Sequence, residues 1–106
     1  MVLPREVQTE IGSAQDALKD GNDGKARVCA RRAVGKAFNL SIYSRKMERP
    51  IGANEILKLI AVDEKFSNDT RKAARRLSAN VTEQELSQRP TEDALLIIQE
   101  LLRTGQ

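Results

Sequence analysis

The sequence contains no histidine and no tryptophan, and its 106 residues include one cysteine, one tyrosine and two phenylalanines. Without histidine, a Ser-His-Asp triad, a Cys-His pair and a histidine-containing zinc or di-iron site cannot be built. A single cysteine also excludes a disulfide within the chain. We therefore expect a protein that is not an enzyme and has no catalytic, cofactor-binding or metal-binding residues.

Long apolar runs are absent as well. No stretch of about 18 apolar residues is present, which argues against a membrane-spanning helix. The opening residues, MVLPREV, place a proline and charges where a signal peptide needs its apolar core. The sequence therefore predicts a cytoplasmic protein that does not bind a membrane.

The scarcity of aromatic residues constrains the core. At 3% aromatic content, the core must be built from Ala, Leu, Ile and Val. That composition suits helices packed on helices better than sheets, which favour aromatic and β-branched residues. We predict a single all-α helical-bundle domain over residues 1–106, with four long helices in an up-down arrangement. The sequence leaves open whether a short fifth helix is present.

Residues 22–43, NDGKARVCARRAVGKAFNLSIY, are predicted to form the central helix, running to about Arg45. At 100° per residue, one line of this helix carries four alanines: Ala26, Ala30, Ala33 and Ala37. Small side chains let neighbouring helices approach closely. Cys29 lies on the same face, where we expect it to be a small buried hydrophobe rather than a reactive thiol.

Capping and helix-breaking residues predict the other boundaries. The first helix begins at Pro4 and ends at Gly21, and Asn22 or Asp23 caps the second, so that the two form an antiparallel hairpin. Further helices are predicted at about 54–66, from a cap at 67–69 to near 79, and from a cap at Thr91 onward. Residues 80–90 are predicted to be a loop.

Positive charge is concentrated in two segments. Residues 25–49 contain eight Lys and Arg against one acid, and residues 71–76 add four more without an acid. The candidate anion-binding or nucleic-acid-binding residues are Arg27, Arg31, Arg32, Lys36, Arg71 and Arg75. Two interpretations stay open: a solvated surface, or a surface that binds phosphates. Since aromatic stacking platforms are absent, only backbone phosphates would be recognised.

A second apolar stripe runs along the helix predicted at 54–66. Leu59, Val62 and Phe66 lie on the side away from its main stripe, and Leu96 lies on the polar side of the last helix. We predict that these four residues form the interface of a two-fold homodimer. The alternative is that Val81 and Leu86, within residues 80–90, fold over the stripe.

Two stretches resemble HEPN domains. The second helix of that family is similar to the stretch GKARVCARRAVGKAF. The C-terminal part of the family's domain is similar to the stretch RKAARRLSANVTEQELSQRPTEDALLIIQELL. The resemblance covers roughly residues 10–103. It implies a small helical bundle that is often dimeric and acts as an RNase or beside a nucleotidyltransferase in toxin–antitoxin and defence systems. RNase members carry an arginine and a histidine four to six residues apart. Because this sequence has no histidine, no catalytic residue is carried over.

The functional prediction is a non-catalytic helical bundle that acts by association, as a homodimer with a macromolecular partner such as a nucleotidyltransferase. The alternative is a nucleic-acid or nucleotide binder that uses the basic residues of the second and fourth helices.

Overall fold

The computed structural model describes residues 2–78 and 86–103. Their helices are α1 (Arg5–Lys19), α2 (Asp23–Leu40), the 3-10 helix η1 (Ile42–Lys46), α3 (Ala53–Val62), α4 (Asn68–Leu77) and α5 (Pro90–Arg103). These ranges contain no strand, so the all-α prediction is confirmed for them, with five α-helices. None of the helices in the described ranges combines the length and the apolar character that crossing a membrane requires.

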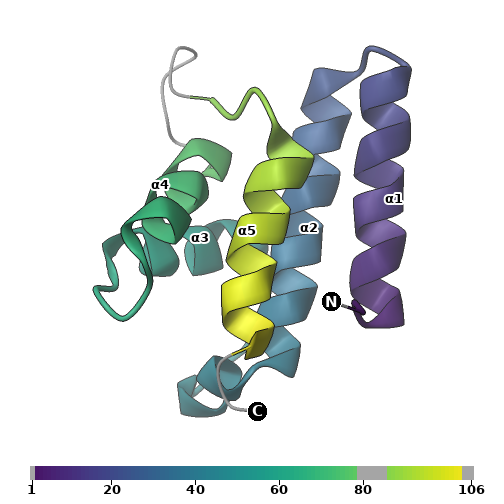
Figure 1. The fold of residues 1–106 in the computed structure, drawn as a ribbon. Coiled ribbons are helices and arrows are strands. Elements are labelled where there is room, and N and C mark those ends of the chain that lie inside the picture. The colour runs from purple at the N-terminus through teal and green to yellow at the C-terminus, as the bar shows by residue number, and fades with distance from the viewer. Residues whose placement is uncertain (1, 79–85, 104–106) are drawn as a thin grey trace.

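Helix α2 is the centre of the arrangement, as predicted. Helices α1, α2 and α5 lie side by side, and α4 lies on the other side of α5 (Figure 1). Helix α2 contacts every other helix of the described chain, including α3 and η1. Its four spine alanines are fully buried, and Cys29 is buried beside them. A Cβ added at Gly35 would lie 3.3 Å from the Cβ of Ala53, which shows how closely α2 approaches α3.

The turn between α1 and α2 follows its local sequence. Gly21 adopts a φ of 76°, the left-handed conformation that glycine reaches without a steric penalty. The Asn22 amide donates to the carbonyl oxygen of Ala17 at 2.8 Å. The Asn22 side chain accepts from the Lys25 amide at 3.1 Å and so caps α2. The predicted hairpin and its cap are confirmed.

Helix α2 ends earlier than predicted, at Leu40 rather than at Arg45. Ser41 has extended backbone (φ −90°, ψ 166°), and its hydroxyl donates to the Phe38 carbonyl oxygen at 2.6 Å. That bond satisfies the Phe38 carbonyl oxygen at the end of α2, where the serine hydroxyl competes with the backbone hydrogen bonds of the helix. The chain then continues as the short helix η1.

Helix α3 also ends early, at Val62, because Asp63 is extended. Phe66 therefore lies outside the helix and turns inward: it is 3% exposed, and its ring centroid lies 5.0 Å from that of Tyr43. The prediction that Phe66 belongs to an exposed stripe is wrong. An aromatic side chain gains more from burial in the core than from a place on the surface, and the break after Val62 allows it to reach the core.

Helices α4 and α5 differ in how well their starts were predicted. Ser67 caps α4 by accepting from the Thr70 amide at 3.2 Å. Helix α5 begins at Pro90, so Thr91 is inside the first turn and not at the cap. The Thr91 hydroxyl is buried and has no hydrogen-bond partner among the described residues. Glu92 and Asp93 lie in the first turn of α5, where the helix dipole favours negative charge.

Candidate functional site

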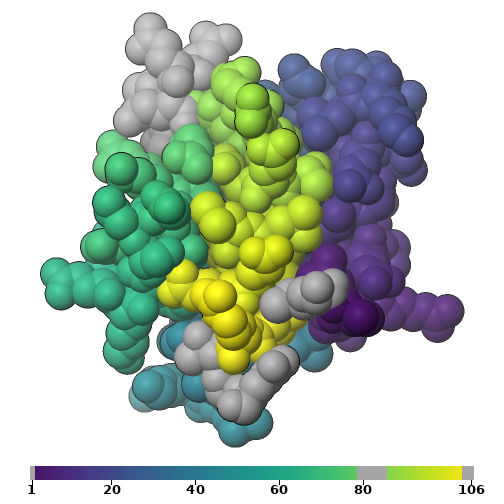
Figure 2. Space-filling view, in the orientation of Figure 1, coloured from purple at the N-terminus to yellow at the C-terminus, as the bar shows by residue number. Residues whose placement is uncertain are grey.

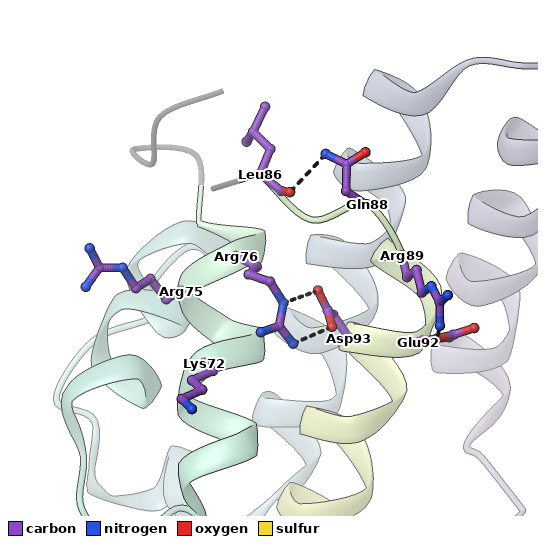
Figure 3. Close-up of a pocket in the computed structure, with 8 residues that line it drawn as sticks. All are labelled: Lys72, Arg75, Arg76, Leu86, Gln88, Arg89, Glu92 and Asp93. Carbon is purple, nitrogen blue, oxygen red and sulfur yellow. Dashed lines mark hydrogen bonds and ion pairs between the residues drawn. The ribbon is translucent and has the colours of Figure 1, made fainter. Parts of the chain in front are cut away.

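The basic residues of α4 face the acidic start of α5 across a pocket of about 600 Å³, which we call the α4–α5 pocket (Figure 3). Its lining comes from α4, from the residues just before α5 and from the first turn of α5. The lining residues are Lys72, Arg75, Arg76, Leu86, Gln88, Arg89, Glu92 and Asp93. Among these described residues, four are cations and two are carboxylates.

Arg76 and Asp93 form the fixed centre of this pocket. The Arg76 Nε and Nη2 donate to Asp93 Oδ2 and Oδ1 at 3.0 and 2.8 Å (Figure 3). The Ser87 hydroxyl donates to the same Oδ2 at 2.6 Å. The hydrogen bonds from Arg76 to Asp93 raise the pKa of Arg76, whereas burial lowers it. The geometry is the bidentate pairing that arginine favours with a carboxylate.

Sequence reasoning missed this pair. Neither Asp93 nor Arg76 is among the candidate residues that the sequence indicated. The two residues lie 17 positions apart on different helices, so no local spacing indicates that they meet. The burial of Asp93, which is 8% exposed, is the observation that separates it from the exposed Glu92 next to it.

The remaining charged side chains of the pocket are closer to solvent. Arg89 and Glu92 form an exposed ion pair at 3.4 Å. Lys72 and Arg75 are exposed on α4, and Arg75 extends away from the Arg76–Asp93 pair (Figure 3).

Two of the predicted anion-binding residues donate hydrogen bonds to backbone carbonyl oxygens. Arg31 Nε donates to the Leu77 carbonyl oxygen at 2.7 Å, and Arg27 Nη1 donates to the Ser87 carbonyl oxygen at 3.5 Å. Burial lowers the pKa of Arg31, and the neighbouring charge of Arg27 lowers it further. These arginines therefore tie α2 to the two ends of the connection between α4 and α5.

The other predicted basic residues differ in their surroundings. Lys36 forms an ion pair with the buried Glu10 at 3.5 Å. Arg32 is exposed, and Arg71 is half-buried, with an Nε that has no hydrogen-bond partner in the described chain. Of the six predicted residues, Arg75 lines the α4–α5 pocket.

A second, more apolar depression lies between η1 and α3, with a volume of about 670 Å³, and we call it the η1–α3 groove. Its lining is Phe38, Tyr43, Lys46, Met47, Leu59, Ile60, Val62, Asp63, Glu64, Lys65 and Phe66. Val62 is 78% exposed and Leu59 is 43% exposed. Of the predicted interface residues, these two remain on the surface of the groove, whereas Phe66 is buried in it. Leu96, 37% exposed on α5, does not line the groove.

The alternative prediction was that Val81 and Leu86 fold over the apolar stripe of α3, and the structure describes one of these two residues. Val81 lies outside the described residues. Leu86 lines the α4–α5 pocket rather than the η1–α3 groove. The described part of this segment therefore leaves Leu59 and Val62 uncovered.

Comparisons of the chain with protein-family models, with curated proteins and with solved structures found no match.

Proposed function

We propose that this protein is a non-catalytic helical-bundle domain that acts by association, and that it pairs with a second copy of itself through the η1–α3 groove. The observation that supports this proposal is the exposure of Val62 and Leu59 at the edge of a groove with an aromatic and aliphatic lining. Covering a side chain of this size fully is worth about 1.5–3 kcal/mol, which makes an uncovered pair of this kind a candidate interface.

The charges around the groove favour a second copy as its occupant. Two lysines, Lys46 and Lys65, and two carboxylates, Asp63 and Glu64, surround the apolar residues. In a two-fold interface the same patch contacts itself, so the lysines of one copy can face the carboxylates of the other. A patch of one charge would repel its own copy, whereas this mixed patch complements itself.

The HEPN-like architecture belongs to the same proposal. The alanine spine of α2 and the acidic start of α5 after a proline support it. In that case a macromolecular partner, such as a nucleotidyltransferase in a toxin–antitoxin or defence context, would bind the dimer. Binding of a nucleic acid through the basic residues is the alternative proposal.

Sedimentation velocity at increasing concentration tests the pairing. We expect the wild type to dimerise and Val62→Lys, alone or with Leu59→Lys, to remain monomeric. Val28→Lys is the matched control, because Val28 is an apolar residue of α2 that is about as exposed as Leu59 and does not line the groove. Each position is at least one-third exposed, so urea denaturation should show all variants folded.

A wild type that stays monomeric at high micromolar concentration would overturn the dimer. A dimer that survives Val62→Lys but is lost in Leu96→Lys would place the interface on α5 and overturn the role of the groove.

A further inference from the structure

We propose that Met47 makes pairing through the η1–α3 groove sensitive to peroxides, so that oxidation of its sulfur separates the two copies. This inference rests on the proposed pairing and concerns its regulation. Val62 and Leu59 supply exposed apolar contacts for that pairing, whereas Met47 supplies an oxidisable sulfur in the same lining.

Met47 lies where two depressions of the surface meet. It lines the η1–α3 groove, and it also lines a smaller depression of about 450 Å³ whose lining includes Pro50 and Ile51. Among the described residues, Phe38 also lines both depressions, but it is 4% exposed, whereas Met47 is 38% exposed. The helix η1, which ends just before Met47, lies at the lower end of the molecule, where its residues reach the surface (Figure 2). A second copy seated in the groove would therefore cover Met47.

The Met47 side chain is open to solvent, whereas the other sulfur-containing side chain of the described residues, Cys29, is 3% exposed. A hydroperoxide transfers one oxygen atom to a thioether. The O–O bond breaks, an S–O bond forms and the sulfur loses two electrons, while hydrogen peroxide is reduced to water. The exposed thioether is thus the group on which this reaction is expected first.

The sulfoxide changes what the groove offers to a second copy. A thioether is apolar and adapts its shape to the surface that covers it. A sulfoxide is polar, and covering it with apolar residues that offer no hydrogen bond is unfavourable. In a two-fold interface the change occurs twice, once in each copy. We therefore expect oxidation of Met47 to raise the dissociation constant of the dimer by roughly tenfold or more.

The test is sedimentation velocity of the full chain before and after treatment with hydrogen peroxide, with the oxidised residues identified by mass spectrometry of peptides. We expect a dimer before treatment and a weaker one once Met47 has gained an oxygen atom. The rate of Met47 oxidation, relative to free methionine in the same solution, should fall at protein concentrations where the dimer predominates, because the second copy covers the side chain.

Three variants make the test sharp. Met47→Leu keeps an apolar side chain without the sulfur, so it should pair equally well before and after peroxide, although it retains Cys29. Met47→Gln introduces a polar side chain and should pair about tenfold or more weakly without peroxide. Leu40→Gln is the matched control, because Leu40 is 49% exposed and lines neither depression, and it should pair like the wild type. Circular dichroism should show all three folded, since both positions are exposed.

The results separate this inference from the pairing on which it rests. A wild type that is monomeric before peroxide would overturn both. A wild-type dimer that survives complete oxidation of Met47 would overturn the inference and leave the pairing intact. So would an equal loss of the dimer in peroxide-treated Met47→Leu, since the responsible residue would then lie elsewhere. A Met47 oxidation rate that is independent of protein concentration would place this side chain outside the interface and would also overturn the inference, as would a Met47 that stays unmodified while free methionine is consumed.

Discussion

Arg31 in the middle of α2 donates its Nε hydrogen to the carbonyl oxygen of Leu77, the last residue of α4, at 2.7 Å. A carbonyl at the end of a helix has no partner within the helix, so a side chain or water must supply one. The arginine that the sequence offered as an anion-binding residue therefore stabilises the end of a neighbouring helix.

We predict that Arg31→Gln lowers the free energy of unfolding by about 1–3 kcal/mol, since it leaves the Leu77 carbonyl without its donor. The matched control is Arg32→Gln, which removes the same charge from the next, exposed position and should change stability by less than about 0.5 kcal/mol. Urea denaturation followed by circular dichroism measures both. Equal midpoints for the two variants would contradict a structural role for Arg31. For the same reason, charge reversal at Arg31 is not a clean test of anion binding.

The Arg76–Asp93 pair can be measured with a double-mutant cycle of Arg76→Gln and Asp93→Asn. We expect a coupling free energy of roughly 1–2 kcal/mol, below that of a fully buried pair, because Arg76 is partly exposed. The corresponding cycle on the exposed Arg89–Glu92 pair should give less than about 0.5 kcal/mol. If both pairs gave the same coupling, the bidentate geometry and the hydrogen bond from Ser87 would add nothing to stability.

The alanine spine predicts the effect of larger side chains in α2. Ala33 is fully buried, and Ala33→Leu should overpack its contacts and cost about 1–3 kcal/mol. Val28→Leu on the same helix is partly exposed and should have an effect within about 0.5 kcal/mol. Thermal denaturation compares the two. An unchanged melting temperature for Ala33→Leu would show that α2 is not the centre of the core.

Two glycines should respond to alanine with opposite signs. Gly12 lies inside α1 with no atom within 4 Å of an added Cβ, so Gly12→Ala should stabilise the protein by about 0.5–1 kcal/mol. Gly21 has a φ of 76°, and Gly21→Ala should destabilise it by about 1 kcal/mol. Chemical denaturation of both variants checks the difference. A gain in stability for Gly21→Ala would contradict the left-handed turn between α1 and α2.

The sequence by itself determined the features that depend on residues within one helical turn of each other. Asn22 caps α2 through the amide of Lys25, three residues away, and Gly21 reverses the chain because it lacks a side chain. The buried spine of α2 follows from the spacing of its alanines. Such interactions form wherever the local chain is helical, which is why they can be predicted without knowing what packs against them.

Only the tertiary structure decided which surfaces are covered and which charges are paired. Phe66 is buried because α3 ends at Val62 and the chain turns it toward Tyr43. Arg76 and Asp93 lie 17 positions apart, and Arg31 and Leu77 lie 46 positions apart. Contacts between such distant positions depend on how the helices are oriented relative to one another. A basic residue has the same local pattern whether it faces solvent, a carbonyl oxygen or a carboxylate, and only the packing of the neighbouring helix selects among the three.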